Sequence, residues 1–486
     1  MSSVAERCTI APGLEVSRVL TGLWQVADME RDGNTMDAQA AAAALVPYVH
    51  AGLTAFDMAD HYGSAELIAG ALRSRIGSPG GVQLLTKWVP QPGPVTRDDV
   101  RSAVQRALTR LDVERIDLLQ FHAWSYDDPS YLDCLFSLQE LKREGLIQHI
   151  GLTNFDVAHL RIVVRSGIEI VSNQVSFSVI DGRPRVGMTR FCSENGISLL
   201  AYGTVAGGFL TDRFLDAPDP AGNPSASWSQ MKYRRFIEAA GGWGAFQTLL
   251  HALDAVARRL GVSIANVATR FILDQPAVAG IIIGARPGQN DHIRDNLRLF
   301  EFRIDETSRS EIEQSLSKLQ PIPGDCGDEY RRPPFLTASG DLSHHVASLP
   351  APYDVRTTAD GRTRVVTGTD WEAIAGYSRA IRIGSRILVS GTTAVHVDRT
   401  IGGDDASAQL HFIIDKVAGV LRSLGGRFDE IVRTRVYLRN IEDWEAVARA
   451  HGERFRDVLP VNTLIQAAPV GDDYLVEMET EAVVSV

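Results

Sequence analysis

Short apolar runs alternate with amphipathic stretches from residue 18 to residue 302. The runs are apolar throughout, which is typical of parallel strands covered on both faces. Eight such runs can be counted, at 19–25, 55–59, 82–87, 116–122, 149–153, 170–175, 197–202 and 280–284. The alternation of strand-like and helix-like stretches predicts repeated βα units and a parallel sheet.

The stretches between the apolar runs carry helix signals. Helices are expected at 37–51, 96–111, 131–143 and 246–260. The second begins with Thr96-Arg97-Asp98-Asp99, a capping box with Asp in place of Glu. Eight strands with intervening helices predict an α/β fold, a closed (β/α)₈ TIM barrel. The open doubly wound sheet is the alternative, but it favours a glycine-rich turn after the first strand, and residues 22–26 do not form one.

The pattern changes after residue 325. Residues 326–374 contain Pro333, Pro334, Pro350 and Pro352, which predicts a linker or extended arm. Residues 375–486 then predict a small α+β domain. It is expected to begin with two hairpin-like strands at 381–390, followed by strands at 432–438, 464–466 and 474–486 and helices at 409–424 and 444–458. The predicted domains are therefore a barrel at 1–325, an arm at 326–374 and a second domain at 375–486.

Composition narrows the possible partners and the compartment. The formal net charge of −11 argues against nucleic acid and against an anionic membrane surface as partners. Neither a signal peptide nor an apolar membrane span is evident, so a cytoplasmic location is expected. The four cysteines are far apart and show no metal-ligand spacing, which predicts reduced thiols and no metal site.

Charged and polar residues follow three successive runs of the predicted barrel. Asp57 lies within the second run and Tyr62 just beyond it, Lys87 ends the third, and His122 ends the fourth. A charge in an apolar strand is costly unless it is paired, so Asp57 and Lys87 are expected to meet on adjacent strands. Because catalytic groups of TIM barrels gather at the carboxyl ends of the strands, these four residues are candidates for one active site.

The four residues together suit acid–base chemistry at a carbonyl oxygen. A Lys⁺ held by Asp57 is expected to lower the pKa of Tyr62. Tyr62 would then protonate the oxygen as hydride reaches the carbon, with His122 positioning the carbonyl. Taken singly, the Asp57–Lys87 pair is equally consistent with an ion pair that only joins strands, and His122 with a core histidine. Their joint occurrence at successive strand ends favours catalysis.

In these residues the chain resembles the aldo-keto reductase superfamily, over roughly residues 15–305. The resemblance implies a catalytic tetrad of Asp57, Tyr62, Lys87 and His122 and an NADP-dependent oxidoreductase acting on CH–OH or carbonyl groups. It also implies that Asn154 and Gln174 hold the nicotinamide carboxamide and that Tyr202 stacks on the ring. The full set of cofactor-binding residues that it implies is Thr153, Asn154, Gln174, Tyr202, Gly203, Gly284, Arg286, His292 and Asn296.

The residues expected to bind the adenosine half of the cofactor depart from the family pattern. Many members have Lys where this chain has Gly284, so Arg286 is the expected contact for the 2′-phosphate, with His292 and Asn296 beside it. This favours NADPH, with NADH possible. Net oxidation of an alcohol or sugar and a non-catalytic NADPH-sensing subunit remain alternatives. The loop at 207–243 is expected either to shape the pocket, with basic and aromatic residues suited to a polar or anionic aldehyde, or to be a surface insertion.

Residues 375–486 resemble the RidA/YjgF family in the segments 387–391, 432–438, 443–444 and 477–482. The resemblance implies a homotrimer and a pocket containing Ser390, Asn462 and Glu479. In active members an Arg that binds the substrate carboxylate stands where this chain has Asn462. Because Asn cannot provide a charged bidentate contact, the sequence favours a trimerisation or metabolite-binding module over an imine deaminase. The whole chain is thus predicted to be a reductase fused to a RidA-like domain.

Overall fold

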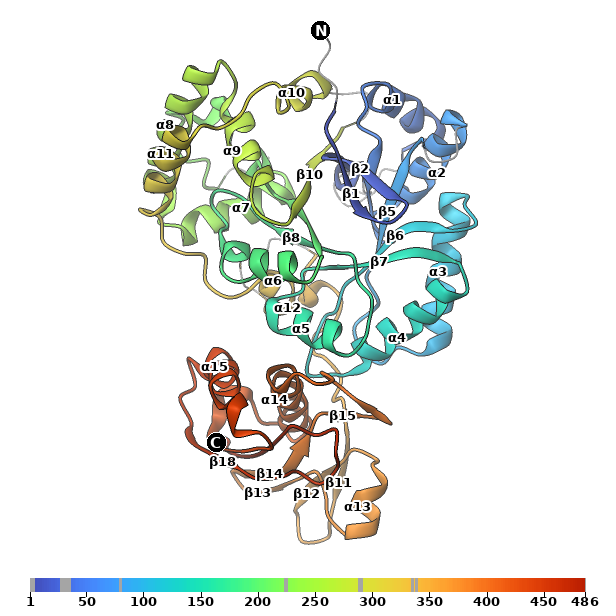
Figure 1. Ribbon diagram of the computed structural model, residues 1–486, viewed down its shortest axis with the longest axis vertical. Coiled ribbons are helices and arrows are strands. Elements are labelled where there is room, and N and C mark those ends of the chain that lie inside the picture. The colour runs from blue at the N-terminus through green and yellow to red at the C-terminus, as the bar shows by residue number, and fades with distance from the viewer. Residues whose placement is uncertain are drawn as a thin grey trace.

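Two domains lie one above the other in the computed structural model (Figure 1). The structure describes residues 5–26, 36–77, 81–222, 226–286, 292–333, 336 and 340–485. The first domain is a closed parallel barrel with neighbouring strands in chain order, and β10 pairs with β3 to close it. Its strands are β3 (Val19–Gly22), β4 (Ala55–Asp57), β5 (Gln83–Trp88), β6 (Ile116–Phe121), β7 (Ile147–Thr153), β8 (Ser172–Ser176), β9 (Ser198–Tyr202) and β10 (Val278–Gly284). The predicted (β/α)₈ barrel is confirmed.

Helices surround the barrel. They are α1 (Ala38–His50), α2 (Ala65–Ile76), α3 (Arg97–Leu111), α4 (Ser130–Arg143), α5 (Val157–Arg165), α6 (Met188–Glu194), α7 (Trp228–Ala239), α8 (Gly242–Leu260), α9 (Ile264–Leu273), α10 (Ile293–Arg298) and α11 (Glu306–Leu316). Helix α3 begins with the predicted capping box, in which the Thr96 side chain accepts a hydrogen bond from the Asp99 N–H. None of the helices in the described part of the chain is long and apolar enough to span a membrane.

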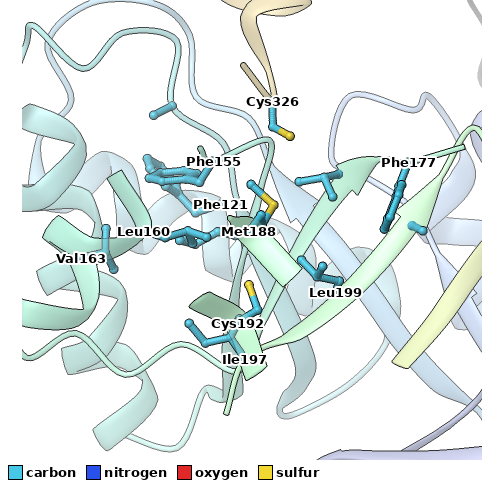
Figure 2. Close-up of a cluster of buried hydrophobic side chains, with 14 of the residues drawn as sticks. Phe121, Phe155, Leu160, Val163, Phe177, Met188, Cys192, Ile197, Leu199 and Cys326 are labelled. Carbon is cyan, nitrogen blue, oxygen red and sulfur yellow. The ribbon is translucent and has the colours of Figure 1, made fainter. Parts of the chain in front are cut away.

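Two apolar layers stabilise the barrel. Figure 2 shows one outside the strands, where Phe121 and Phe155 pack toward Leu160 of α5 and toward Met188 and Cys192 of α6. The second fills the interior, below a hairpin of β1 (Arg7–Ala11) and β2 (Leu14–Ser17) that precedes the first barrel strand. The hairpin covers the amino-terminal end of the strands and leaves their carboxyl ends for the site.

The second domain is a mixed sheet with helices on one face. Within the described residues its strand order is β11-β12-β13-β14-β19-β17-β18. The strands are β11 (Asp354–Thr357), β12 (Thr363–Val366), β13 (Ala380–Ile383), β14 (Arg386–Thr393), β17 (Ile431–Leu438), β18 (Val461–Gln466) and β19 (Val476–Val483). Helices α14 (Ala406–Ser423) and α15 (Trp444–Phe455) cover one face, while α13 (Asp370–Ala375) and the short β15 (Val395–His396) and β16 (Arg399–Thr400) lie at its margin. The predicted α+β architecture is confirmed.

The segment between the domains contributes structure to both of them. Helix α12 (Asp328–Arg331) lies against the barrel, with Glu329 fully buried. Strands β11 and β12 also fall in the segment expected to be an arm. They extend the second sheet, because β12 pairs with β13 and β11 pairs with β12. Proline spacing alone does not reveal either contact, because both depend on surfaces far away in the sequence.

Candidate active site

Asp57 and Lys87 form a buried ion pair at the carboxyl ends of adjacent strands. Lys87 Nζ lies 2.7 Å from Asp57 Oδ2, and both residues are 4% exposed. The register of β4 against β5 brings the two side chains together. Asp57 lies beside Leu85, and the carboxyl ends of both strands meet at the barrel mouth. The expected pairing is therefore present.

Two amides complete the environment of Asp57. Gln174 Nε2 donates to Asp57 Oδ1 at 2.7 Å, and Gln120 Nε2 donates to the same oxygen at 3.2 Å. Gln174 Nε2 also lies 2.9 Å from Gln120 Oε1. Sequence reasoning missed Gln120, although a lone amide inside an apolar strand is a usable signal for a buried hydrogen bond.

Tyr62 lies at the wall of the same cavity. Its ring packs edge-on against Trp24, with centroids 4.8 Å apart, and Lys87 Nζ is 5.0 Å from its ring centroid. Desolvation and the negative charge of Asp57 raise the pKa of Tyr62 well above its usual value. The expectation of a lowered pKa is wrong, because burial and the Asp57 charge decide the direction of the shift.

His122 presents an unpaired ring nitrogen to the cavity. Its Nδ1 lies 3.4 Å from the Thr153 carbonyl, while Nε2 is buried and has no hydrogen-bond partner among the described residues. Burial, assisted by the nearby Arg331 charge, lowers the pKa of His122 well below its usual value. A buried nitrogen of this kind needs a partner, and a bound ligand can provide one.

The expected nicotinamide residues lie at the ends of β7, β8 and β9. Tyr202 Oη donates to Asn154 Oδ1 at 2.7 Å, and Thr153 Oγ1 donates to the Gln174 carbonyl at 3.3 Å. Gly203 adopts a positive φ of 76° and lies against Tyr233, so a larger residue would be strained there. These residues meet the tetrad in one cavity.

The expected adenosine residues lie farther along the mouth. Gly284 ends β10 and lines the cavity, where a side chain would meet Gln25. Arg286 is exposed just beyond the strand, and the buried Asn296 follows His292 on α10. Arg286, His292 and Asn296 are not among the residues that line the cavity, and residues 287–291 lie outside the described part of the chain.

The cavity has a volume of about 220 Å³ and includes all four tetrad residues. Its wall also contains Trp228, from the loop expected to shape the pocket, and residues that sequence reasoning did not assign, namely Trp24, Trp124, Lys232 and Tyr330. Trp228 and Lys232 come from α7, so the segment at 207–243 contributes to the pocket. Tyr330 comes from α12, and its hydroxyl accepts a hydrogen bond from Lys232 Nζ at 2.8 Å.

Helix α12 is held by a buried charge cluster. Arg183 lies 2.9 Å from Glu329 and 2.8 Å from Asp181, and all three side chains are at most 4% exposed. Although burial opposes ionisation, the charges of Arg183 and Lys232 lower the pKa of Glu329 to about 2. This cluster fixes Tyr330 in the cavity wall.

The residues expected to form a pocket in the second domain are divided between two faces of the sheet. Ser390 and Glu479 line a broad concavity of about 920 Å³ on the face without helices. Glu479 accepts hydrogen bonds there from Arg435 and Tyr437, at 2.8 and 3.0 Å. Asn462 pairs in register with the buried Thr434 and donates to its hydroxyl at 2.9 Å, so it faces the helix layer. One chain therefore does not bring Asn462 and Glu479 together.

Each of the two domains matches the model of a known protein family. The chain belongs to the aldo/keto reductase family of oxidoreductases, whose model matches residues 18–317. The C-terminal domain is of the RidA/YjgF type, and the family model described as endoribonuclease L-PSP matches residues 367–484.

Individual relatives resemble one domain each. "Protein tas" of Escherichia coli K12 is 29% identical over 238 residues, covering 45% of this chain and 66% of that protein. "Aflatoxin B1 aldehyde reductase member 2" of Rattus norvegicus is 30% identical over 218 residues, covering 42% and 59%. "Uncharacterized protein SCO2049" of Streptomyces coelicolor is 36% identical over 126 residues, covering 26% and 94%. The chain thus spans less than two thirds of the length of the first two of these relatives.

Solved structures give matches of the same kind. The holo form of the aldo-keto reductase AKR11C1 from Bacillus halodurans is 21% identical, with a TM-score of 0.48, and the match covers 64% of this chain and 96% of that one. Rv2704 from Mycobacterium tuberculosis, described as a member of the YjgF/YER057c/UK114 family, is 34% identical, with a TM-score of 0.24, and the match covers 26% and 100%.

Proposed function

We propose that the barrel reduces an aldehyde or ketone to an alcohol with NADPH, and that Tyr62 is the general acid. The observation that carries this proposal is the convergence of Asp57, Tyr62, Lys87 and His122 on one cavity with Asn154, Gln174 and Tyr202. The residues fit a nicotinamide, because the amides offer both donors and acceptors to a carboxamide and Tyr202 offers a ring face. When bound, NADPH supplies the hydride.

The residues of this chain control the proton. The raised pKa of Tyr62 keeps its hydroxyl protonated at neutral pH, which is the form that can donate to a carbonyl oxygen. Lys87 stabilises the phenolate left after donation, and Asp57 holds Lys87 in place. His122 lines the same cavity and helps to shape the place where the carbonyl binds beside Tyr62. In the oxidation direction the same groups accept the proton from an alcohol, which is the alternative direction of net reaction.

The cavity wall supports a small aromatic or polar carbonyl compound as substrate. Trp24, Trp124 and Trp228 offer apolar faces, and Lys232 offers a positive charge beside Tyr330. One relative is named as an aldehyde reductase, which supports carbonyl reduction as the reaction class.

NADPH is expected to be preferred over NADH. Arg286 is exposed beyond β10, where its guanidinium can bind a 2′-phosphate that NADH lacks. The Michaelis constant for NADPH should therefore be about tenfold lower than that for NADH, as one charge-assisted contact provides. Arg286→Ala should remove most of this difference, with Arg294→Ala on the neighbouring helix as the matched control. A lower constant for NADH in the native chain would contradict the assignment.

We also propose that the second domain assembles the chain into a homotrimer or a multiple of one. The helix-free face of its sheet carries exposed apolar side chains, among them Val461 at 64% and Ile465 at 47%. Apolar side chains exposed on an open sheet face indicate an interface. Light scattering at micromolar concentration should give a trimer or higher multiple, and Val461→Asp should dissociate it. A native chain that is monomeric under these conditions would contradict this proposal.

A further inference from the structure

The two domains of this chain contact each other through helices α5 and α14. Ion pairs at the rim of the contact join Arg161 to Asp405 at 2.8 Å and Arg422 to Asp127 at 2.7 Å. Such partly exposed pairs contribute little individually. The centre of the contact is different, because four charged groups meet there and three of them are buried.

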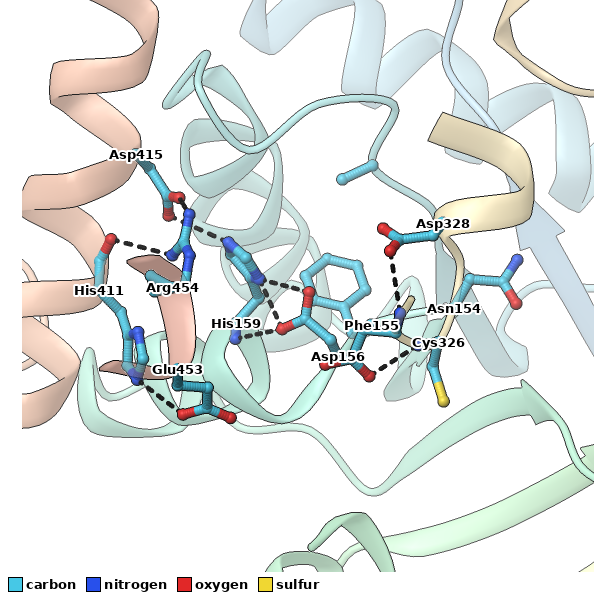
Figure 3. Close-up of polar contacts among 12 residues, drawn as sticks. Asn154, Phe155, Asp156, His159, Cys326, Asp328, His411, Asp415, Glu453 and Arg454 are labelled. Carbon is cyan, nitrogen blue, oxygen red and sulfur yellow. Dashed lines mark hydrogen bonds and ion pairs between the residues drawn. The ribbon is translucent and has the colours of Figure 1, made fainter. Parts of the chain in front are cut away.

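His159 lies at that centre, between one carboxylate from each domain (Figure 3). Its Nδ1 is 2.6 Å from Asp156 Oδ1 in the barrel, and its Nε2 is 3.0 Å from Asp415 Oδ2 on α14. Arg454 of α15 donates to the other oxygen of Asp415 at 2.5 Å. His159 is 4% exposed and Asp415 is 2% exposed.

The cluster consists of Asp156, His159, Asp415 and Arg454, and its charges balance when His159 is protonated. Burial alone would lower the pKa of His159, but the carboxylates of Asp156 and Asp415 outweigh it and raise the pKa. Each ring nitrogen faces a carboxylate, so both can donate only as an imidazolium. Two cations and two anions then share one buried site across the domain boundary.

Asp156 places this group next to the expected nicotinamide site along the chain. Asp156 stands two positions after Asn154 and caps α5, where its side chain accepts from the His159 N–H at 2.9 Å. Asn154 adopts a left-handed backbone conformation with φ 63°. Asparagine adopts this conformation more readily than most other residues, so its neighbours decide how firmly it is held there. Asp156 fixes the first turn of α5 two positions further along the chain.

A second route reaches Asn154 from the other side. Arg331 of α12 donates from both terminal nitrogens to the Asn154 carbonyl, each at 2.9 Å. Its guanidinium lies 4.3 Å from the Tyr126 ring, and Tyr126 stacks on His159 with centroids 3.3 Å apart. His159 therefore supports the Asn154 turn through Asp156 and through Tyr126.

We propose that Asp415 is a positioning residue for cofactor binding: by holding His159 and Asp156, the C-terminal domain sets the conformation of Asn154 and thereby the affinity of the barrel for the nicotinamide half of NADPH. This inference rests on the proposed function of the barrel. It gives the second domain a role within each chain, separate from assembly between chains.

The test is Asp415→Asn in the full-length chain, which preserves side-chain size and removes the charge. The dissociation constant for NADPH should rise ~tenfold, as a coupling energy of ordinary size produces. The constant for 2′-phospho-ADP-ribose, which lacks the nicotinamide, should stay unchanged. Amide hydrogen exchange over residues 155–159 of the cofactor-free protein should become faster.

Two further variants make the result specific. Arg422→Gln removes a rim contact of the same interface and should change neither constant. In an Asn154→Ala background, Asp415→Asn should weaken NADPH binding no further, because the two residues act through one contact. Equal weakening of both ligands, or unchanged NADPH affinity with unchanged exchange, would overturn the proposal. A native chain that does not bind NADPH would contradict the proposed function, and the exchange measurement would still test the positioning.

Discussion

Replacing Tyr62 with Phe is expected to lower kcat for carbonyl reduction by ~10²–10⁴-fold, the usual contribution of a positioned general acid. The Tyr62 hydroxyl is a proton donor in the cavity wall, and the Lys87–Asp57 pair lies beside its ring. Phe retains the packing on Trp24 and removes only the proton donor. Consumption of NADPH with a panel of aldehydes and ketones measures the effect.

The affinity for NADPH should change little in this variant, since Tyr62 acts on the substrate oxygen. Tyr131→Phe is the matched control, because Tyr131 is buried on α4 outside the cavity and should be dispensable for turnover. The raised pKa of Tyr62 keeps the acid form populated, so kcat of the native chain should be level from about pH 6 to 9 and fall only at higher pH. Native turnover in Tyr62→Phe would exclude Tyr62 as the acid.

Arg183→Met is expected to lower the free energy of unfolding by ~3–5 kcal/mol, the cost of leaving buried charge uncompensated. Arg183 separates Asp181 from Glu329, and both carboxylates are fully buried. Without the guanidinium, two like charges remain in an apolar environment. Urea unfolding of the two proteins at neutral pH measures the difference.

The loss should depend on pH with a defined sign. The pKa of Glu329 is lowered from 4.5 to about 2, so its paired form contributes stability above the unfolded-state pKa. That contribution is lost as the pH falls from 4.5 toward 2. The difference between native and Arg183→Met should therefore shrink over this range. Arg185→Met, which breaks a partly exposed pair with Glu313, is the control and should cost less than about 1 kcal/mol. An equal loss in the two variants would refute the role of the buried cluster.

The barrel could be predicted from the sequence because its strands are buried on both faces and are therefore continuously apolar. The hairpin of β1 and β2 was not predicted, since four or five residues per strand give too little periodicity. The hairpin-like strands expected at 381–390 are β13 and β14, which turn at Gly384 with a positive φ of 59°.

The sequence predicts those residues of the site that lie at the ends of barrel strands. Asp57 and Lys87 meet because adjacent parallel strands end at the same rim. Lys232, Glu329 and Tyr330 could not be predicted, because their positions depend on how α7 and the segment after the barrel cross the mouth. The sign of the Tyr62 pKa shift was predicted wrongly, since it depends on how deeply the hydroxyl is buried, which residue type does not reveal.

The central claim is that this barrel transfers hydride from NADPH to a carbonyl carbon. The most direct test incubates the native chain with NADPH deuterated at C4 of the nicotinamide and a panel of aldehydes and ketones, followed by mass spectrometry of the products. The account predicts an alcohol with deuterium on the former carbonyl carbon, formed in step with NADPH consumption and lost in Tyr62→Phe. Tight NADPH binding without deuterium transfer to any carbonyl compound would contradict it and favour a cofactor-sensing barrel.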